Sequence, residues 1–161
     1  MSAAAADPRP LTAEVRIDAA PSAVWSVVSD VGRTGEWSPE CARVVAVGGV
    51  RRGGFLLGLN RRGKVRWATV SRVTSFDPER SLGWTVLTNR SQWTYRLEPD
   101  GDGTRLTETR RTPRGESRFA VWFTERLLGG QQAHDDELEA GMAAGLARIR
   151  ALVESATATP A

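Results

Sequence analysis

The segment from Val15 to Trp37 limits the possible folds more than any other part of the chain, because it predicts a strand and a short helix followed by an aromatic residue. Val15 and Ile17 alternate with charged neighbours, as in a half-buried strand. Pro21 suits the first position of a helix, and valines then recur at helical spacing. Gly32 is the residue type that ends a helix in a left-handed turn. We therefore expect a strand, a helix that ends near Gly32, and Trp37 beyond it.

Strand patterns dominate the middle of the chain. Each candidate strand is bounded by turn residues, which is typical of an antiparallel meander. The clearest hairpin has Trp93, Tyr95 and Leu97 alternating with polar residues before the turn 99–103, after which Leu106 resumes the alternation. The predicted strands are Arg43 to Val47, Phe55 to Asn60, Lys64 to Phe76, Leu82 to Thr88, Ser91 to Glu98 and Thr104 to Thr112.

The pattern changes to helical spacing after Pro113. A first apolar stripe runs from Phe119 to Leu127, the pair Gly129-Gly130 interrupts it, and a longer stripe runs from Leu138 to Val153. Gly141 and Gly145 lie one turn apart on this second helix, where each costs about 1 kcal/mol relative to alanine. Close packing against the sheet is the favoured explanation for them, and room for a ligand is the alternative.

Length and composition indicate one globular domain. The chain has 161 residues and six tryptophans, and Cys41 is its one cysteine, which excludes an intramolecular disulfide. Met1 to Thr12 has neither the basic region nor the apolar run of a secretory signal, and no segment is apolar enough for a membrane span. We expect a cytoplasmic protein with a flexible tail at 1–12, one domain at 13–155 and a second tail at 156–161.

Basic residues are concentrated in the middle of the chain. Residues 51–118 hold 15 Arg or Lys and seven acidic residues, although the net charge is only +3. No nucleic-acid recognition motif accompanies this excess, so we expect a solvated outer face and no nucleic-acid partner.

The order of elements resembles the START-like (SRPBCC) superfamily, and within it the bacterial polyketide cyclase/dehydrase group. The resemblance covers nearly the whole chain. It rests on Ala20-Pro21, Val24-Trp25, Asp30 and Trp37, the strand start 103–107, and the helix His134 to Glu154 around Gly141-Met142. It implies an α+β helix-grip fold, in which a curved antiparallel sheet of six to seven strands wraps a long C-terminal helix and encloses an apolar cavity.

Strand register points to two charged residues inside this cavity. If the last strand is regular, the alternation that buries Leu106 also turns Glu108 and Arg110 inward. Buried charges are tolerated when they pair, so Glu108 and Arg110 could form an ion pair, and such a pair can orient a polar group of a ligand. The alternative is that the strand end leaves the core and both side chains are solvated.

Aromatic and sulfur-containing side chains are the other candidates for ligand contact. Trp37 is placed by the resemblance at the entrance of the cavity; the alternative is a surface clamp on its loop. The others are equally compatible with ordinary core packing. The full set comprises Trp37, Trp67, Trp84, Trp93, Tyr95, Glu108, Arg110, Phe119, Phe123 and Met142.

Catalytic chemistry has weaker candidates. His134 is the one side chain with an ordinary pKa near neutrality, and either His134 or Glu108 could move a proton; a surface helix position is the simpler explanation of His134. Cys41 is expected to be a small buried apolar residue. Residues 58–64 match the start of a phosphate-binding loop, but Val65 replaces the Ser or Thr and a strand follows, so we expect a hairpin turn. No cofactor motif or metal-ligand spacing is present.

Three functions are compatible with these patterns. The first is binding of a small, mostly hydrophobic molecule, a lipid, polyketide or aromatic metabolite, without catalysis. The second is a polyketide cyclase or aromatase that uses the same cavity. The third is a protein-interaction module, which a collapsed cavity and an exposed apolar patch would favour. The sequence leaves the oligomeric state open between monomer and homodimer.

Overall fold

Seven antiparallel strands form one sheet in the order β1-β7-β6-β5-β4-β3-β2. The computed structural model describes residues 9–115 and 117–158. The strands are β1 (Leu11–Ile17), β2 (Cys41–Val47), β3 (Phe55–Arg62), β4 (Val65–Asp77), β5 (Ser81–Val86), β6 (Gln92–Asp100) and β7 (Gly103–Arg111). The helices are α1 (Pro21–Val28), the 3-10 helix η1 (Val31–Glu36), α2 (Arg118–Leu127) and α3 (Gln131–Ala158).

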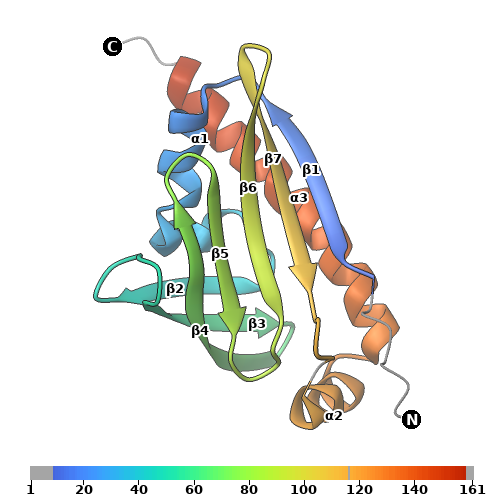
Figure 1. The fold of residues 1–161 in the computed structure, drawn as a ribbon. Helices are drawn as coiled ribbons and strands as arrows, with labels where there is room; N and C mark the ends of the chain where they lie inside the picture. Colours follow the sequence, from blue (N-terminus) through green and yellow to red (C-terminus); the bar gives the residue numbers. More distant parts are fainter. Residues whose placement is uncertain (1–8, 116, 159–161) are drawn as a thin grey trace, which may run out of the picture.

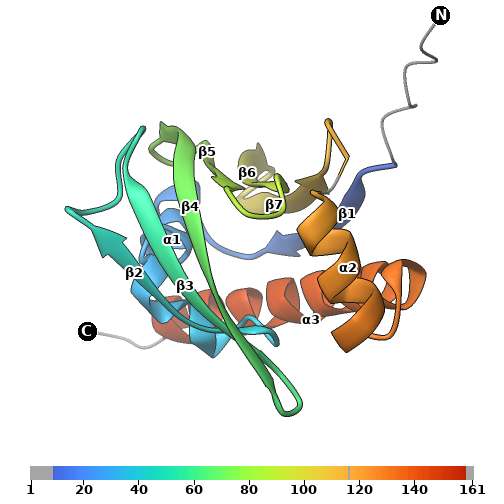
Figure 2. The same ribbon diagram turned by 90° about the horizontal axis from the view of Figure 1, so that it is seen from below.

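The sheet curves around the long helix α3. Strands β2 to β7 follow one another as a meander, and β1 adds to its end by pairing with β7. In Figures 1 and 2, α3 lies against one face of β1 and β7, while β2, β3 and β4 form a wall to its side. The predicted α+β helix-grip architecture is confirmed, and so is the hairpin turn after residue 58, because β3 ends at Arg62 and β4 begins at Val65.

Several element boundaries differ from the sequence-based expectation, and three of the differences concern the two expected tails and Gly32. β1 begins at Leu11, inside the segment expected to be a tail, because its first residues pair with the end of β7. α3 continues to Ala158. Gly32 does not end a helix in a left-handed turn: α1 ends at Val28, where the Ser29 hydroxyl donates to the Trp25 carbonyl, and Gly32 lies inside η1.

The buried side chains form two clusters. The larger one joins β1, α1, β6 and β7 to the C-terminal half of α3, and Leu106 and Ile149 at its centre are fully buried. The smaller one joins η1 to β3, β4 and β5 through Val31, Leu56 and Val73. Complete burial of a side chain of this size contributes roughly 1.5–3 kcal/mol, so the larger cluster is the main source of stability.

Gly141 and Gly145 form a notch in the surface of α3. A Cβ atom at Gly141 would lie 2.9 Å from the Pro39 side chain, and one at Gly145 would lie 3.3 Å from the Trp37 carbonyl oxygen. Close packing therefore explains both glycines, but their neighbour is the loop after η1 and not the sheet. We call these two glycines the notch.

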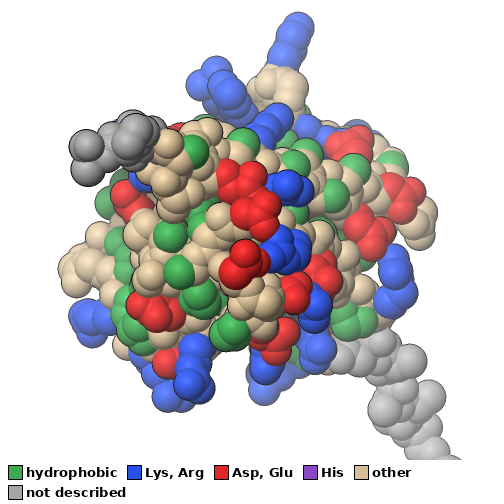
Figure 3. All heavy atoms as spheres, turned by 90° about the horizontal axis from the view of Figure 1, so that it is seen from above, with side chains coloured by type: hydrophobic (Ala, Val, Ile, Leu, Met, Phe, Trp, Pro, Cys, Tyr) green, Lys and Arg blue, Asp and Glu red, His purple; other side chains and the backbone are tan. Residues whose placement is uncertain are grey.

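Opposite charges are mixed on the end of the molecule that carries the β6–β7 hairpin. Figure 3 shows acidic and basic side chains interspersed over this end. Arg16 bonds both Asp18 and Asp102 there, and Arg105 bonds Asp100. Within the described residues, no helix is long and apolar enough to cross a membrane.

Candidate functional site

A cavity of about 740 Å³ lies between the sheet and the helices α2 and α3. This volume falls within the range of roughly 300–1,000 Å³ that is usual for small-molecule sites. Every side chain expected to contact a ligand lines this cavity, and His134 lines it as well: Trp37, Trp67, Trp84, Trp93, Tyr95, Glu108, Arg110, Phe119, Phe123 and Met142. That these residues contact a ligand remains a prediction.

Trp37, Tyr95 and Glu108 form a hydrogen-bonded series at the buried side of the cavity. Trp37 is only 2% exposed, so it belongs to the core and is not a lid at the entrance. Its Nε1–H donates to the Tyr95 hydroxyl at 3.2 Å. The Tyr95 oxygen thus acts as acceptor, and the Tyr95 hydroxyl group also interacts with the carboxyl group of Glu108, its partner across β6 and β7.

Glu108 is a buried carboxyl group in a largely apolar wall. The regular register of β7 turns Glu108 and Arg110 inward, and their exposed fractions are 7% and 6%. Burial raises the pKa of Glu108 to about 8, although the hydrogen bond from Tyr95 opposes this rise. Burial and the nearby Glu108 carboxyl also raise the pKa of Tyr95 well above its ordinary value. Glu108 therefore carries a proton at neutral pH.

The expected ion pair between Glu108 and Arg110 is wrong. Arg110 instead pairs with Asp135 of α3 at 3.5 Å, and its guanidinium carbon lies 5.9 Å from the centre of the Trp93 ring. The long Arg110 side chain extends along the wall toward α3, whereas the shorter Glu108 stays beside Tyr95. Arg110 thereby connects the sheet to α3 and covers an aromatic face.

Aromatic rings cover much of the remaining wall. Trp84 and Trp93 stack with ring centroids 6.4 Å apart and an interplanar angle of 4°. On another side of the cavity, the rings of Trp67 of β4 and Phe123 of α2 pack edge to face, with their centroids 5.7 Å apart. The wall thus offers flat, polarisable surfaces from β4, β5, β6 and α2.

Helix α2 is held over the cavity by caps and by one arginine. The Ser117 hydroxyl accepts from the Ala120 N–H and donates to the Thr88 carbonyl, which ties α2 to the β5–β6 loop. Arg62, at the end of β3, donates to the Leu128 carbonyl and to Glu137. These contacts fasten α2 to the β5–β6 loop at its start and to the end of β3 at its other end.

The polar lining residues that sequence reasoning missed include Glu40, Asn60 and Arg62. The alternation in β3 that buries Leu56 also turns Asn60 and Arg62 inward, so this signal was available. Glu40 lies in the loop after Pro39, where no periodicity reports its direction. Burial raises its pKa to about 7, against the opposing effect of Arg62 and Arg110.

Cys41 and His134 have environments that limit their chemistry. Cys41 is half-buried, and burial raises the pKa of its thiol, which makes the thiol a poor nucleophile at neutral pH. His134 is half-buried on α3 and lines the cavity, so it is not merely a surface residue. Among the described residues, no three His, Cys, Asp or Glu side chains cluster as a metal site would require.

The sequence model of the family described as polyketide cyclase/dehydrase and lipid transport matches residues 9–154. The chain belongs to this family. No curated protein matches the chain in sequence. The polyketide cyclase/dehydrase resemblance expected from the sequence is thus confirmed.

Solved structures of similar proteins include other members of this polyketide-cyclase-like fold. The polyketide-cyclase-like protein Cgl2372 of Corynebacterium glutamicum is 28% identical, covers 94% of this chain and 96% of its own, and superposes with a TM-score of 0.62. The Zhui aromatase/cyclase of a Streptomyces species is 17% identical over 92% of this chain and 95% of its own, with a TM-score of 0.72.

The di-domain aromatase/cyclase StfQ of the steffimycin biosynthetic pathway has the same TM-score of 0.72 at 13% identity. The match covers 93% of this chain but 52% of StfQ. The similarity to Zhui and StfQ establishes the shared fold.

Proposed function

We propose that this protein binds a small, mostly apolar molecule in the cavity between the sheet and helices α2 and α3. The observation that carries the proposal is a 740 Å³ cavity with stacked tryptophans on its wall and a few polar groups among them. Such a combination is typical of ligand sites. Lipids, polyketides and aromatic metabolites are the candidate classes. We do not propose the third alternative, a protein-interaction module, because a collapsed cavity would favour it and this cavity is not collapsed.

The energetics are compatible with specific binding. Transfer of a ligand with ten methylene equivalents into this wall would contribute about 8 kcal/mol, at roughly 0.8 kcal/mol each. Loss of translational and rotational freedom offsets part of that gain, so we expect micromolar affinity or weaker.

Quenching of tryptophan fluorescence tests this proposal. We expect oleate, cholesterol or a tricyclic aromatic polyketide to quench the wild-type protein saturably. The variant Asn60→Trp, which places a large side chain inside the cavity, should weaken that binding at least tenfold. Gln92→Trp, on the exposed outer face of β6, is the matched control and should bind as the wild type does. Absence of saturable binding for all three classes would overturn the proposal.

A second candidate function, ring closure with dehydration, is favoured by the protonated state of Glu108. A buried acid with a pKa of about 8 can give its proton to a hydroxyl group that leaves as water. His134 would take a proton from a carbon between two ketones, so that this carbon attacks a ketone carbon of the same molecule and the ketone oxygen is protonated to a hydroxyl group. Removal of a second proton from the same carbon would then expel that hydroxyl group as water. Product analysis with a linear poly-β-ketone tests this idea: Glu108→Gln and His134→Ala should each reduce turnover at least a hundredfold. Unchanged turnover in both variants would exclude these roles.

A further inference from the structure

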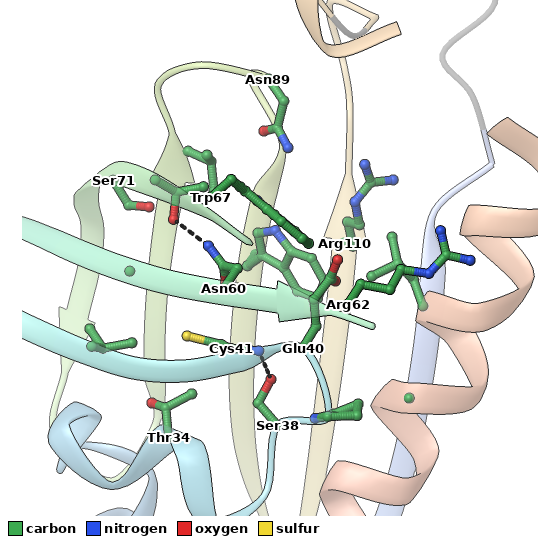
Figure 4. A pocket seen from close by; sticks show the side chains of 18 of the residues that line it. Thr34, Ser38, Glu40, Cys41, Asn60, Arg62, Trp67, Ser71, Asn89 and Arg110 are labelled. Atoms are coloured by element: carbon green, nitrogen blue, oxygen red, sulfur yellow. Dashed lines mark hydrogen bonds between the residues drawn. The ribbon is translucent and has the colours of Figure 1, made fainter. Parts of the chain in front are cut away.

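The loop between η1 and β2 holds the Glu40 side chain over the cavity. The Arg61 N–H donates to the Glu40 carbonyl at 2.9 Å, and the Cys41 N–H donates to the Ser38 hydroxyl at 2.9 Å. The backbone on both sides of the carboxylate is therefore fixed. Figure 4 shows the carboxyl group of Glu40 directed into the space between Trp67 and Arg110. Glu40 thus faces the cavity from the wall opposite the β6–β7 hairpin.

One carboxyl oxygen of Glu40 lacks a hydrogen-bond partner. Its Oε1 atom is buried from solvent and, among the described residues, no donor reaches it. A buried polar atom left in this state costs about 1–3 kcal/mol of stability. Native proteins seldom retain such an atom without a role, and a ligand that supplies a donor would remove the penalty.

The charges around Glu40 select the kind of donor. Arg62 and Arg110 lie near it, and each is itself paired, Arg62 with Glu137 and Arg110 with Asp135. These charges nearly balance one another, so neither an ammonium group nor a carboxylate of a ligand would find a free counter-charge here. A neutral donor needs none. A hydroxyl group is such a donor, and the ring of Trp67, which lies beside Glu40 in Figure 4 and contacts Phe123, suits an aromatic body.

We propose that Glu40 is a ligand-binding residue whose Oε1 accepts a hydrogen bond from the hydroxyl group of an uncharged aromatic molecule. This assignment rests on the proposed binding function and names its ligand class. It adds a polar contact on the β2 side of the cavity, separate from Glu108 on β7. The ligand is thereby expected to carry its hydroxyl group toward the loop that follows Pro39.

Four naphthalene probes test the assignment by titration calorimetry at pH 8, where Glu40, whose pKa is raised to about 7, is mostly ionised. The probes are naphthalene, 2-naphthol, 2-naphthoate and 2-(aminomethyl)naphthalene, which share one body and differ in the polar group. We expect 2-naphthol to bind the wild-type protein about tenfold more tightly than naphthalene, since one buried hydrogen bond contributes about that factor. The carboxylate and the ammonium should bind no better than naphthalene.

Variants at Glu40 separate its contribution from the apolar cavity. Glu40→Leu should remove the preference for 2-naphthol while the affinity for naphthalene stays within about twofold. Glu40→Gln keeps a carbonyl acceptor and the same shape, so it should retain most of the preference and serves if the leucine variant does not fold. Glu98→Gln, an exposed carboxylate on β6, is the control and should behave as the wild type.

The outcomes distinguish this inference from the proposed function. If naphthalene binds but 2-naphthol gains nothing, or if the gain survives in Glu40→Leu, the role of Glu40 is wrong while the apolar cavity stands. A preference for the carboxylate or for the ammonium would also overturn the role. If none of the four probes binds, the proposed binding function fails, and the ligand role of Glu40 fails with it.

Discussion

At the scale of single residues, Tyr95 joins two polar groups that the core would otherwise isolate. Its hydroxyl oxygen accepts a hydrogen bond from Trp37, and the same hydroxyl group interacts with the carboxyl group of Glu108. Glu108 nevertheless keeps a pKa of about 8, because a hydrogen bond from Tyr95 compensates only part of the lost hydration. The interior of this cavity consequently holds an uncharged acid.

Glu108 should make the stability of the protein depend on pH. The folded protein keeps the Glu108 proton up to about pH 8, whereas the unfolded chain releases it near pH 4.5. The contribution of protonated Glu108 to the free energy of unfolding is therefore fully present below pH 4.5 and decreases as the pH rises to about 8. We expect Glu108→Gln to match the wild type near pH 5 and to exceed its free energy of unfolding at pH 9 by on the order of 3 kcal/mol.

Urea denaturation at several pH values measures this difference. Glu40 has a raised pKa of about 7 and contributes a dependence of the same sign, so the slope should decrease in Glu108→Gln without vanishing. Glu98→Gln, with an exposed carboxylate, provides the baseline. Parallel pH curves for the wild type and Glu108→Gln would show that Glu108 is ionised at neutral pH.

At the scale of elements, the notch in α3 determines where the loop after η1 lies. An exposed Gly→Ala change inside a helix normally stabilises by about 1 kcal/mol. At Gly141 the added methyl group would lie 2.9 Å from Pro39, so we expect Gly141→Ala to bring no such gain. In the background Pro39→Ala, where the ring is removed, the same change should stabilise the protein by about 1 kcal/mol.

Thermal unfolding of the four proteins in this double-mutant cycle gives the coupling directly. Ala143→Gly, at an exposed position on the same helix, calibrates helix propensity in this chain. Additive effects of Gly141→Ala and Pro39→Ala would mean that the close approach has no energetic weight.

The elements also show how far the sequence could be interpreted. The alternation in β7 was sufficient to place Glu108 and Arg110 in the cavity, because that strand is regular. Their partners were not predictable, since Asp135 comes from α3 and Tyr95 lies on the neighbouring strand. Glu40 lies in a loop, where no periodicity of the sequence indicates the direction of its side chain. Local patterns report which face a side chain occupies, whereas partners depend on how distant segments pack.

At the scale of the whole molecule, the cavity borders both hydrophobic clusters. The larger cluster is formed by β1, β6, β7, α1 and α3, and the smaller one by η1, β3, β4 and β5. Helix α2 belongs to neither cluster, and Trp122 on its outer side is 57% exposed. The part of the cavity wall that α2 forms is therefore held less firmly than the larger core.

Ligand binding should slow amide hydrogen exchange more in the cavity wall outside the larger cluster than in the larger cluster itself. In amide hydrogen exchange with and without 2-naphthol, we expect slower exchange in η1, the β3–β4 hairpin and α2, because they lie in the cavity wall outside the larger cluster. Amides in the part of α3 around Ile149 should change least at short exchange times. A uniform change over the whole chain would contradict this division.

The notch in α3 has a consequence for ligand size. The loop it receives runs from Trp37 to Glu40, so it carries both the hydrogen-bond partner of Tyr95 and the carboxyl group that we propose as a ligand contact. Two missing side chains on one helix therefore set the spacing between those contacts. We expect related chains with bulkier residues at positions 141 and 145 to hold the loop farther out, and so to accept longer molecules between the same two groups.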